Sequence, residues 1–297
     1  MKIDLIFLGT SQAVPTSKRN HTAIFFKYKE ESILVDCGEG TQRQFRIAGI
    51  NPCSLTKILI THWHGDHILG IPGLLQTLVL NGYNKKLSIY GPQGTKRFME
   101  NIFSLFVFVG KINIEVIEAS GKFFENKDFI LEAFPLTHGP PCNAYSFTEK
   151  EKRRIDPKKL KKIGLSGPLV GKLQKGESIV FNGKKVKSES VSYIEKGKKI
   201  SFVLDTSMNV NCIKAAKEAD LAIIESSYSA EMKDKAAEYH HLTCEDAANI
   251  AKKANAKKLI LTHVSQRHEK EEYKLLKSAK NIFPQTQLAQ DFMNIEI

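Results

Sequence analysis

The stretch Lys57-Ile-Leu-Ile-Thr-His-Trp-His-Gly-Asp-His67 gathers three histidines and an aspartate directly after an apolar run typical of a buried β-strand. Successive side chains of an extended chain point to opposite faces, so His62 and His64 can direct both imidazoles to one side. The glycine that follows them permits a tight turn before Asp66 and His67. We therefore expect a strand that ends in a cluster of metal ligands.

Four potential ligands at this density suit two cations better than one, because crowding keeps all four from reaching a single tetrahedral ion. Imidazoles combined with a carboxylate favour zinc or another divalent transition metal over calcium. A surface histidine cluster that holds no metal is the alternative. It is disfavoured because the cluster abuts an apolar strand and because further candidate ligands follow other apolar runs.

Three further candidates each follow an apolar run that predicts a strand. His138 comes after residues 129–137, Asp205 after Phe-Val-Leu and His263 after Leu-Ile-Leu-Thr. A single histidine at a strand end is more often a partly buried structural residue. Their common position at strand ends is what makes the three candidates convincing together.

The two halves of the chain resemble each other in short stretches. Residues 57–62 (Lys-Ile-Leu-Ile-Thr-His) are similar to 258–263 (Lys-Leu-Ile-Leu-Thr-His), and 33–36 are similar to 202–205. Chance similarity is one explanation, and a duplicated α/β half is the other. A duplication predicts that strand ends from both halves meet at one site, which is where ligands bind in α/β proteins.

Periodicity and turn residues predict the other elements. The strands expected in the first half are Lys2–Leu8, Thr22–Tyr28 and Ser32–Val35, and those in the second half are Lys199–Leu204, Leu221–Ile224 and Lys258–Thr262. Helices are expected at Thr41–Ile47 and Cys244–Ala254.

The composition is that of an ordinary globular protein, with 297 residues of which 42% are hydrophobic and 26% charged. The first eight residues lack the uninterrupted apolar core of a signal peptide, and no apolar run approaches the roughly 20 residues of a membrane span. The five cysteines are scattered, so buried free thiols are favoured over disulfides or a cysteine zinc site. We expect a cytoplasmic protein with no membrane partner.

The net charge of +12 is concentrated between Glu149 and Lys199, where sixteen Lys or Arg stand against six Asp or Glu, a difference of +10. Such a segment suits a polyanion, most commonly nucleic acid, and a lysine-rich solvated surface is the alternative.

Residues 149–187 are also too long and polar for a simple connection, which predicts an inserted arm. A disordered linker is the alternative, but the apolar residues of the segment argue against it. These are Leu165, Leu169, Val170 and Leu173.

The stretch Thr61-His-x-His-x-Asp-His67 resembles the signature of the metallo-β-lactamase superfamily, and the later candidates His138, Asp205 and His263 fit its remaining ligand positions in order. The resemblance implies an α/β (α+β) fold, a four-layer αββα sandwich with the metals at one edge of its two sheets. Residues 1–297 would form a single domain from which the basic arm is extruded. The signature does not by itself give the substrate.

Further stretches resemble the ribonuclease Z (tRNase Z) family within that superfamily. They are Phe7–Ser11, Pro15–Asn20, Asp36–Gln42, Gly91–Thr95, Leu261–Arg267 and the basic segment with Gly167-Pro168, and they span nearly the whole chain. The resemblance implies a zinc-dependent endoribonuclease that removes the 3′ trailer from precursor tRNA. The products would be a tRNA with a 3′-hydroxyl and a trailer with a 5′-phosphate.

The resemblance also implies residue roles. One divalent ion would be held by His62, His64 and His138, the other by Asp66, His67 and His263, with Asp205 bridging the two. Asp66 would accept the proton of the attacking water, and His241, charged and held by Glu225, would protonate the leaving oxygen. The alternative is that His241 or Thr243 merely starts the helix near Glu245 and that Glu225 is a surface acid.

The arm would bind the RNA backbone without reading its sequence. Its candidate residues are Arg153, Arg154, Lys158, Lys159, Lys161, Lys162, Gly167, Pro168, Lys172 and Lys175. Arg19 and Asn20 would bind the 3′ end of the RNA near the metals, and a plain loop turn is the alternative. The family usually forms homodimers.

Two rival functions remain. A small-molecule phosphodiesterase or arylsulfatase on the same fold would have no need of the basic arm. A non-catalytic RNA-binding relative is disfavoured because all seven ligand positions are filled.

Overall fold

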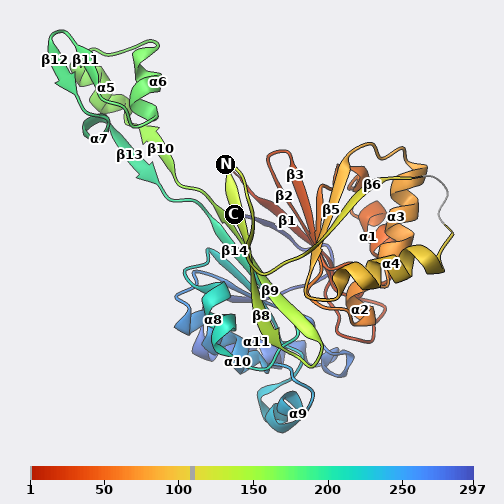
Figure 1. Cartoon of the computed structure of the whole chain (residues 1–297). Helices are drawn as coiled ribbons and strands as arrows, with labels where there is room; N and C mark the ends of the chain where they lie inside the picture. The colour runs from red at the N-terminus through yellow and green to blue at the C-terminus, as the bar shows by residue number, and fades with distance from the viewer. Residues whose placement is uncertain (1, 108–110) are drawn as a thin grey trace. The chain divides into compact units, whose positions relative to one another are not determined.

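The computed structural model describes residues 2–107 and 111–297. The chain divides into two compact units, coloured by residue number in Figure 1. The larger unit takes in the chain up to Glu125, then Leu131–Phe147 and Lys199–Ile297. The smaller unit consists of Asn126–Ile130 and Thr148–Lys198.

The larger unit holds most of two seven-stranded sheets, one formed largely by each half of the chain. The first has the order β18-β1-β2-β3-β4-β5-β6, with β18 (Asn294–Glu296), β1 (Asp4–Gly9), β2 (Ala23–Tyr28), β3 (Glu31–Val35), β4 (Lys57–Leu59), β5 (Lys86–Gly91) and β6 (Asn113–Glu118). The second has the order β17-β16-β15-β14-β9-β8-β7, with β17 (Thr286–Leu288), β16 (Leu259–Thr262), β15 (Leu221–Glu225), β14 (Lys199–Val203), β9 (Pro141–Glu149), β8 (Phe129–Thr137) and β7 (Gly121–Glu125). Strands β3 to β6 are parallel in one sheet and β14 to β17 in the other, so their carboxyl ends share an edge.

Each sheet is covered by helices on its outer face. The first packs against α1 (Thr41–Ile47), α3 (Ile71–Leu80) and α4 (Thr95–Leu105) through one buried apolar cluster that includes Phe45, Leu74 and Met99. The second packs against α8 (Val210–Ala216), α10 (Cys244–Lys253) and α11 (Glu272–Ile282) through another that includes Ala247 and Leu275.

Aromatic side chains fill the space between the sheets. The ring of Phe26 on β2 lies 5.6 Å from Phe202 on β14 and 5.4 Å from Phe147 on β9. The buried hydroxyl of Tyr145 donates a hydrogen bond to the carbonyl of Ile60 at 2.7 Å, which joins β9 to the end of β4. Helix, sheet, sheet and helix thus form four layers, and the predicted αββα sandwich is confirmed.

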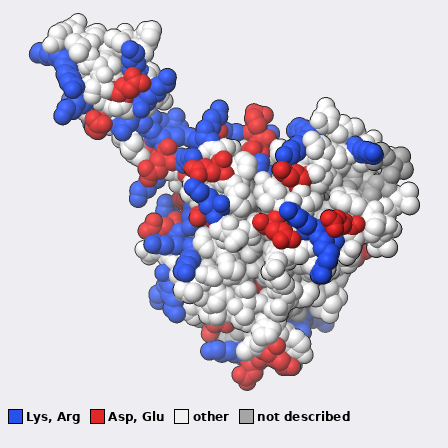
Figure 2. Space-filling model, in the orientation of Figure 1, with Lys and Arg blue, Asp and Glu red and all other residues white. Residues whose placement is uncertain are grey.

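The smaller unit contains the predicted basic arm. Its elements are β10 (Lys152–Ile155), α5 (Pro157–Ile163), α6 (Leu169–Gln174), β11 (Ile179–Phe181), β12 (Lys184–Val186), α7 (Ser188–Val191) and β13 (Ser192–Glu195). Leu165 and Leu173 form a small apolar core with Ile179 and Val191, so helices and strands occupy the segment. Antiparallel pairing of β10 with β13 extends the unit beyond the predicted boundary at Lys187. Figure 2 shows several Lys and Arg on the visible face of this unit, mostly toward its margins.

All five cysteines are free, as predicted, and four of them are buried. Within the described ranges, none of the helices combines the length and the hydropathy that crossing a bilayer requires.

Candidate metal centre and active site

Residues at the carboxyl ends of strands from both sheets meet at one edge of the sandwich. His62 follows β4, Asp205 follows β14 and His263 follows β16. Two imidazoles from opposite halves of the chain, His67 and His263, bring their Nε2 atoms within 3.2 Å of each other. The prediction that the two halves place their strand ends at one site is confirmed.

The first group of ligand atoms is formed by three histidines and an aspartate. The Nδ1 of His64 lies 3.0 Å from Nε2 of His62 and 3.1 Å from Nε2 of His138. Asp205 Oδ2 lies 3.6 Å from the first of these Nε2 atoms and 3.5 Å from the second. Four donor atoms that converge on one point can hold a divalent cation.

The second group shares Asp205 with the first. Its Oδ1 lies 3.1 Å from Nε2 of His263, and its Oδ2 lies 3.5 Å from Nε2 of His67. Asp66 completes the group, with Oδ2 at 3.3 Å from His67 Nε2 and 3.4 Å from His263 Nε2. The structure therefore brings together all seven predicted ligands, with Asp205 between the two groups.

The donor set fits divalent metal. Among the described residues, the buried Oδ1 of Asp205 accepts no hydrogen bond, although a buried carboxylate oxygen otherwise needs one. Burial lowers the pKa of His62 well below its ordinary value, and the charge of His67 lowers it further, which leaves the neutral imidazole that binds metals. Burial would raise the pKa of Asp205, but the surrounding imidazoles outweigh it and hold that carboxyl ionised.

In His67 and His138, the ring nitrogen that does not face the ligand groups has an acceptor of its own. His67 Nδ1 donates to Asp36 Oδ2 at 2.7 Å, and His138 Nδ1 donates to the carbonyl of His240 at 3.0 Å. Each contact makes Nδ1 the donor and directs Nε2 toward the ligand groups, where the neutral ring would bind a cation. Asp36 is held in turn by Thr61, whose backbone N–H donates to its Oδ1 at 2.7 Å and whose hydroxyl donates to its Oδ2 at 2.8 Å.

Neither Asp36 nor Thr61 was among the site residues predicted from the sequence. The signal was present, because Asp36 directly follows an apolar strand, as the proposed ligands do. Three strand-end residues also have left-handed backbone: Asp36 with φ 58°, Asp205 with φ 44° and His263 with φ 57°. Such backbone is unfavourable outside glycine and concentrates at functional sites.

Beside the metal ligands lies a pair formed by His241 and Glu225. His241 Nδ1 lies 3.1 Å from each carboxylate oxygen of Glu225, which also accepts from Thr206 N at 2.7 Å and Ser227 Oγ at 2.6 Å. Burial would lower the pKa of His241, but the Glu225 charge and hydrogen bond outweigh it and raise the pKa to about 9. The imidazole is thus protonated near neutral pH.

Of the two residues considered as the start of the helix, Thr243 caps it and His241 does not. The Thr243 hydroxyl accepts from Asp246 N at 3.1 Å and the Asp246 carboxylate accepts from Thr243 N, so this capping box starts α10. Glu225 is fully buried and therefore no surface acid.

Comparison with known proteins agrees with this geometry. The chain is 41% identical to ribonuclease Z of Methanothermobacter thermautotrophicus, covering 99% of this chain and 97% of the relative. It is 43% identical to ribonuclease Z of Methanocaldococcus jannaschii, covering 91% and 88%. Human tRNase Z, short form, superposes with a TM-score of 0.72 at 30% identity and 98% coverage of both chains. The chain belongs to the ribonuclease Z family. A family model described as anti-Pycsar protein Apyc1 also matches residues 3–103, about a third of the chain.

In this ribonuclease Z family member, some of the predicted RNA-binding residues of the arm bond to other side chains, whereas others are exposed. Arg153 Nη1 donates to Ser192 Oγ at 2.9 Å, and Arg154 pairs with Glu195 at 2.7 Å. Helix α5 instead exposes four lysines, and α6 and its C-terminus expose two more. These are Lys158, Lys159, Lys161, Lys162, Lys172 and Lys175. Gly167, with φ 83°, makes the turn into Pro168, the N-cap of α6.

Arg19 and Asn20 are engaged within the protein. Arg19 is buried, and its guanidinium bonds to Glu272 Oε1 at 2.7 Å, Thr10 Oγ1 at 2.6 Å and the carbonyl of Ala289 at 2.7 Å. The amide of Asn20 donates to the carbonyl of Glu39 at 2.7 Å. These contacts favour the alternative in which the loop is structural, because the guanidinium is buried and both Nε and Nη1 already donate within the protein.

Proposed function

We propose that this ribonuclease Z family member is a metal-dependent endoribonuclease that cuts precursor tRNA at the 3′ end of the mature sequence. The convergence of seven ligand residues beside the buried His241–Glu225 pair is the observation that carries the proposal. It provides both a metal centre and a separate protonated acid, which hydrolysis of an unactivated phosphodiester needs.

We propose that two zinc ions bind here, because imidazole and carboxylate donors form two groups that share Asp205. Cations held by these residues would supply a water of lowered pKa and would offset the charge of the phosphodiester. Asp66 is the better candidate to accept the water's proton, since 11% of its side chain is exposed against 3% for Asp205. A partly exposed carboxylate can pass the proton on to solvent, whereas a buried one cannot.

His241 then supplies the proton that the leaving oxygen requires. Glu225 occupies its Nδ1, so Nε2 is the nitrogen from which the proton departs. The products are a tRNA 3′-hydroxyl and a trailer with a 5′-phosphate, because the protonated oxygen is the O3′ of the last retained nucleoside.

The basic arm, residues 149–187, is proposed to bind the tRNA backbone through the exposed lysines of α5 and α6. Lysines contact phosphates without distinguishing bases, which suits a substrate recognised by shape.

A homodimer is also proposed. Large apolar side chains remain exposed on the helical side of the first sheet, among them Ile47 at 51%, Leu69 at 55% and Leu80 at 75%. The free cysteines and the tRNA substrate suit a cytoplasmic location.

The test is cleavage of a precursor tRNA with a labelled 3′ trailer by the purified full chain, with and without a chelator. We expect one cut after the last nucleoside of the mature tRNA, abolished by chelation and restored by zinc or manganese. Intact precursor, with turnover of a small aryl phosphodiester by the same preparation, would overturn the tRNA assignment and favour a small-molecule phosphodiesterase.

A further inference from the structure

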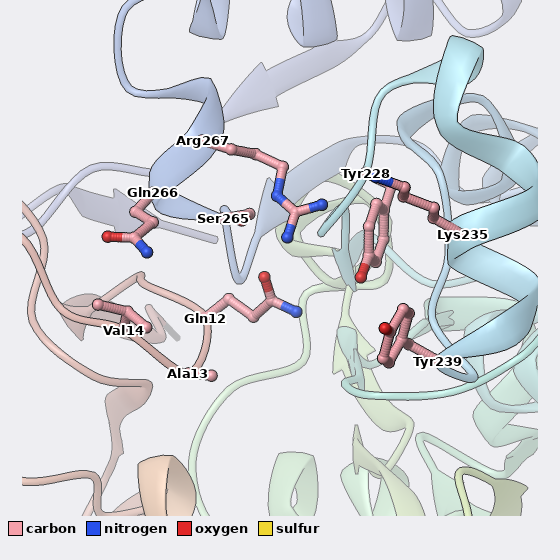
Figure 3. A pocket seen from close by; sticks show the side chains of 9 residues that line it. All are labelled: Gln12, Ala13, Val14, Tyr228, Lys235, Tyr239, Ser265, Gln266 and Arg267. Atoms are coloured by element: carbon pink, nitrogen blue, oxygen red, sulfur yellow. The ribbon is translucent and has the colours of Figure 1, made fainter.

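A pocket of about 360 Å³ opens beside the acid His241 and holds none of the metal ligands. Loops after three strands and the helix α9 (Lys233–Glu238) surround it. Figure 3 shows the rings of Tyr228 and Tyr239 and the guanidinium of Arg267 gathered on one side, with the amide of Gln12 directed toward them. Its volume is within the range typical of sites for small organic ligands.

The pocket adjoins the nitrogen that releases the catalytic proton. The amide nitrogen of Gln12, which lines the pocket, lies 3.4 Å from Nε2 of His241. The ring centroid of Tyr228 lies 5.9 Å from that of the same histidine. An oxygen that receives the proton from Nε2 must therefore lie at the mouth of this pocket.

The lining has the chemistry of a nucleoside site. Tyr239 is 56% exposed, so its ring is available for a base to stack on, whereas Tyr228 is 3% exposed and forms the wall. The guanidinium carbon of Arg267 lies 4.9 Å from the centroid of Tyr228, which holds a cation at the rim. Lys235 adds a second cation, and the amides of Gln12 and Gln266 can donate to and accept from the edge of a base.

We propose that this pocket binds the nucleoside on the 5′ side of the scissile phosphate, the last one retained in the product tRNA, with its base against Tyr239. This inference rests on the proposed function. If hydrolysis leaves a 3′-hydroxyl, the oxygen that receives the proton is the O3′ atom of that nucleoside. Arg267 and Lys235 bind the phosphate that precedes this nucleoside. Amides accept more than one pattern of donors and acceptors, so the pocket tolerates different bases at this position.

The test couples a change in the protein to a change in the RNA. Tyr239→Ala and a precursor tRNA that lacks the base of the last retained nucleoside are measured separately and together. Each change alone should weaken binding in chelator, and kcat/KM with metal, by roughly 5- to 150-fold, the contribution of one stacked base. Combined, they should cost little more than either alone, because both remove the same contact.

Two further variants separate stacking from general damage. Tyr239→Phe keeps the ring and should retain wild-type coupling to the base. Tyr273→Ala removes a similarly exposed tyrosine, 65% exposed on α11, and should change neither binding nor the effect of the missing base.

Fully independent losses from Tyr239→Ala and the missing base would overturn the inference. Coupling of Tyr239 to the first trailer nucleoside would overturn it too, since the pocket would then lie on the other side of the scissile bond. If the wild-type protein turns over an aryl phosphodiester but neither binds nor cuts the precursor, the proposed function itself fails. That result differs from a failure of the pocket assignment alone.

Discussion

Both carboxylate oxygens of Glu225 lie 3.1 Å from Nδ1 of His241. The carboxylate is fully buried, and burial would raise its pKa, but the His241 charge outweighs this and lowers the pKa below its ordinary value. A buried charge is costly to leave unpaired, so each member of the pair keeps the other ionised. The pair thus keeps a protonated imidazole beside the predicted metal ligands, as the proposed acid requires.

We expect Glu225→Gln to lower kcat for precursor tRNA about 100-fold, because the amide cannot keep His241 charged. His241 acts in its protonated form, so activity is present below its pKa and is lost as pH rises through it. The pKa of about 9 should fall without the carboxylate, which moves the alkaline limb of the pH–rate profile to lower pH. Glu238→Gln, an exposed acid on α9, is the matched control. An unshifted limb in Glu225→Gln would contradict the assignment.

The two ligand groups predict separable metal sites. Metal analysis of the purified protein should find two equivalents in the wild type and one in His64→Ala or His263→Ala. Chelation should lower the Tm, and zinc at about 100 times its Kd should restore roughly 2.7 kcal/mol of stability. His240→Asn keeps the backbone carbonyl that holds His138 and should keep both ions. Loss of all metal from either alanine variant would indicate a single site.

The arm should govern the salt dependence of binding and not the chemistry. Replacing Lys158, Lys159, Lys161 and Lys162 on α5 with alanine should weaken tRNA binding and flatten the plot of log K against log salt by about 0.7–0.9 per lost contact. Turnover of a small aryl phosphodiester should persist. The control is Lys252→Ala combined with Lys253→Ala, which removes exposed positive charges from α10, outside the arm. An unchanged slope in the α5 variant would exclude these lysines from the RNA interface.

Arg19 should prove structural. Its buried guanidinium pairs with Glu272, so Arg19→Met leaves a carboxylate and a carbonyl without partners and should cost about 3 kcal/mol or more of stability. Denaturant unfolding measures that loss, and the salt dependence of tRNA binding by the folded fraction should not change. Arg19→Met combined with Glu272→Met should recover part of the stability. A stable Arg19→Met protein with weakened tRNA binding would return this residue to the RNA interface.

The burial of Arg19 is a feature that could not be predicted from the sequence. Strand ends such as His62 and His263 were predictable, because each directly follows an apolar run and parallel strands bring their ends to one edge. A charge pattern, by contrast, does not distinguish a buried, paired arginine from an exposed one. The extent of the smaller unit was equally hidden, since it depends on pairing Lys152 with Glu195, 43 residues apart. Contacts between residues distant in sequence produce no local periodicity, so they cannot be predicted from the sequence pattern.

Asp36 belongs to the same class of long-range contact, since its carboxylate reaches His67 and Thr61 far along the chain. Asp36→Asn tolerates the left-handed backbone at this position but offers only one acceptor oxygen for contacts that now use two. We expect the imidazole of His67 to lose its fixed tautomer and the affinity for zinc to fall about 10- to 100-fold. Competition with a chromophoric chelator measures that affinity.

Asn126→Ala is a suitable control for folding, because its side chain accepts backbone hydrogen bonds in a turn of the smaller unit and contacts no proposed ligand. It should leave zinc affinity at the wild-type level. Should Asp36→Asn bind zinc as tightly as the wild type while its Tm falls, Asp36 would serve only to anchor the loop after β4. A parallel loss of zinc affinity and precursor cleavage, with the fold intact, would place Asp36 among the residues that position the metal centre.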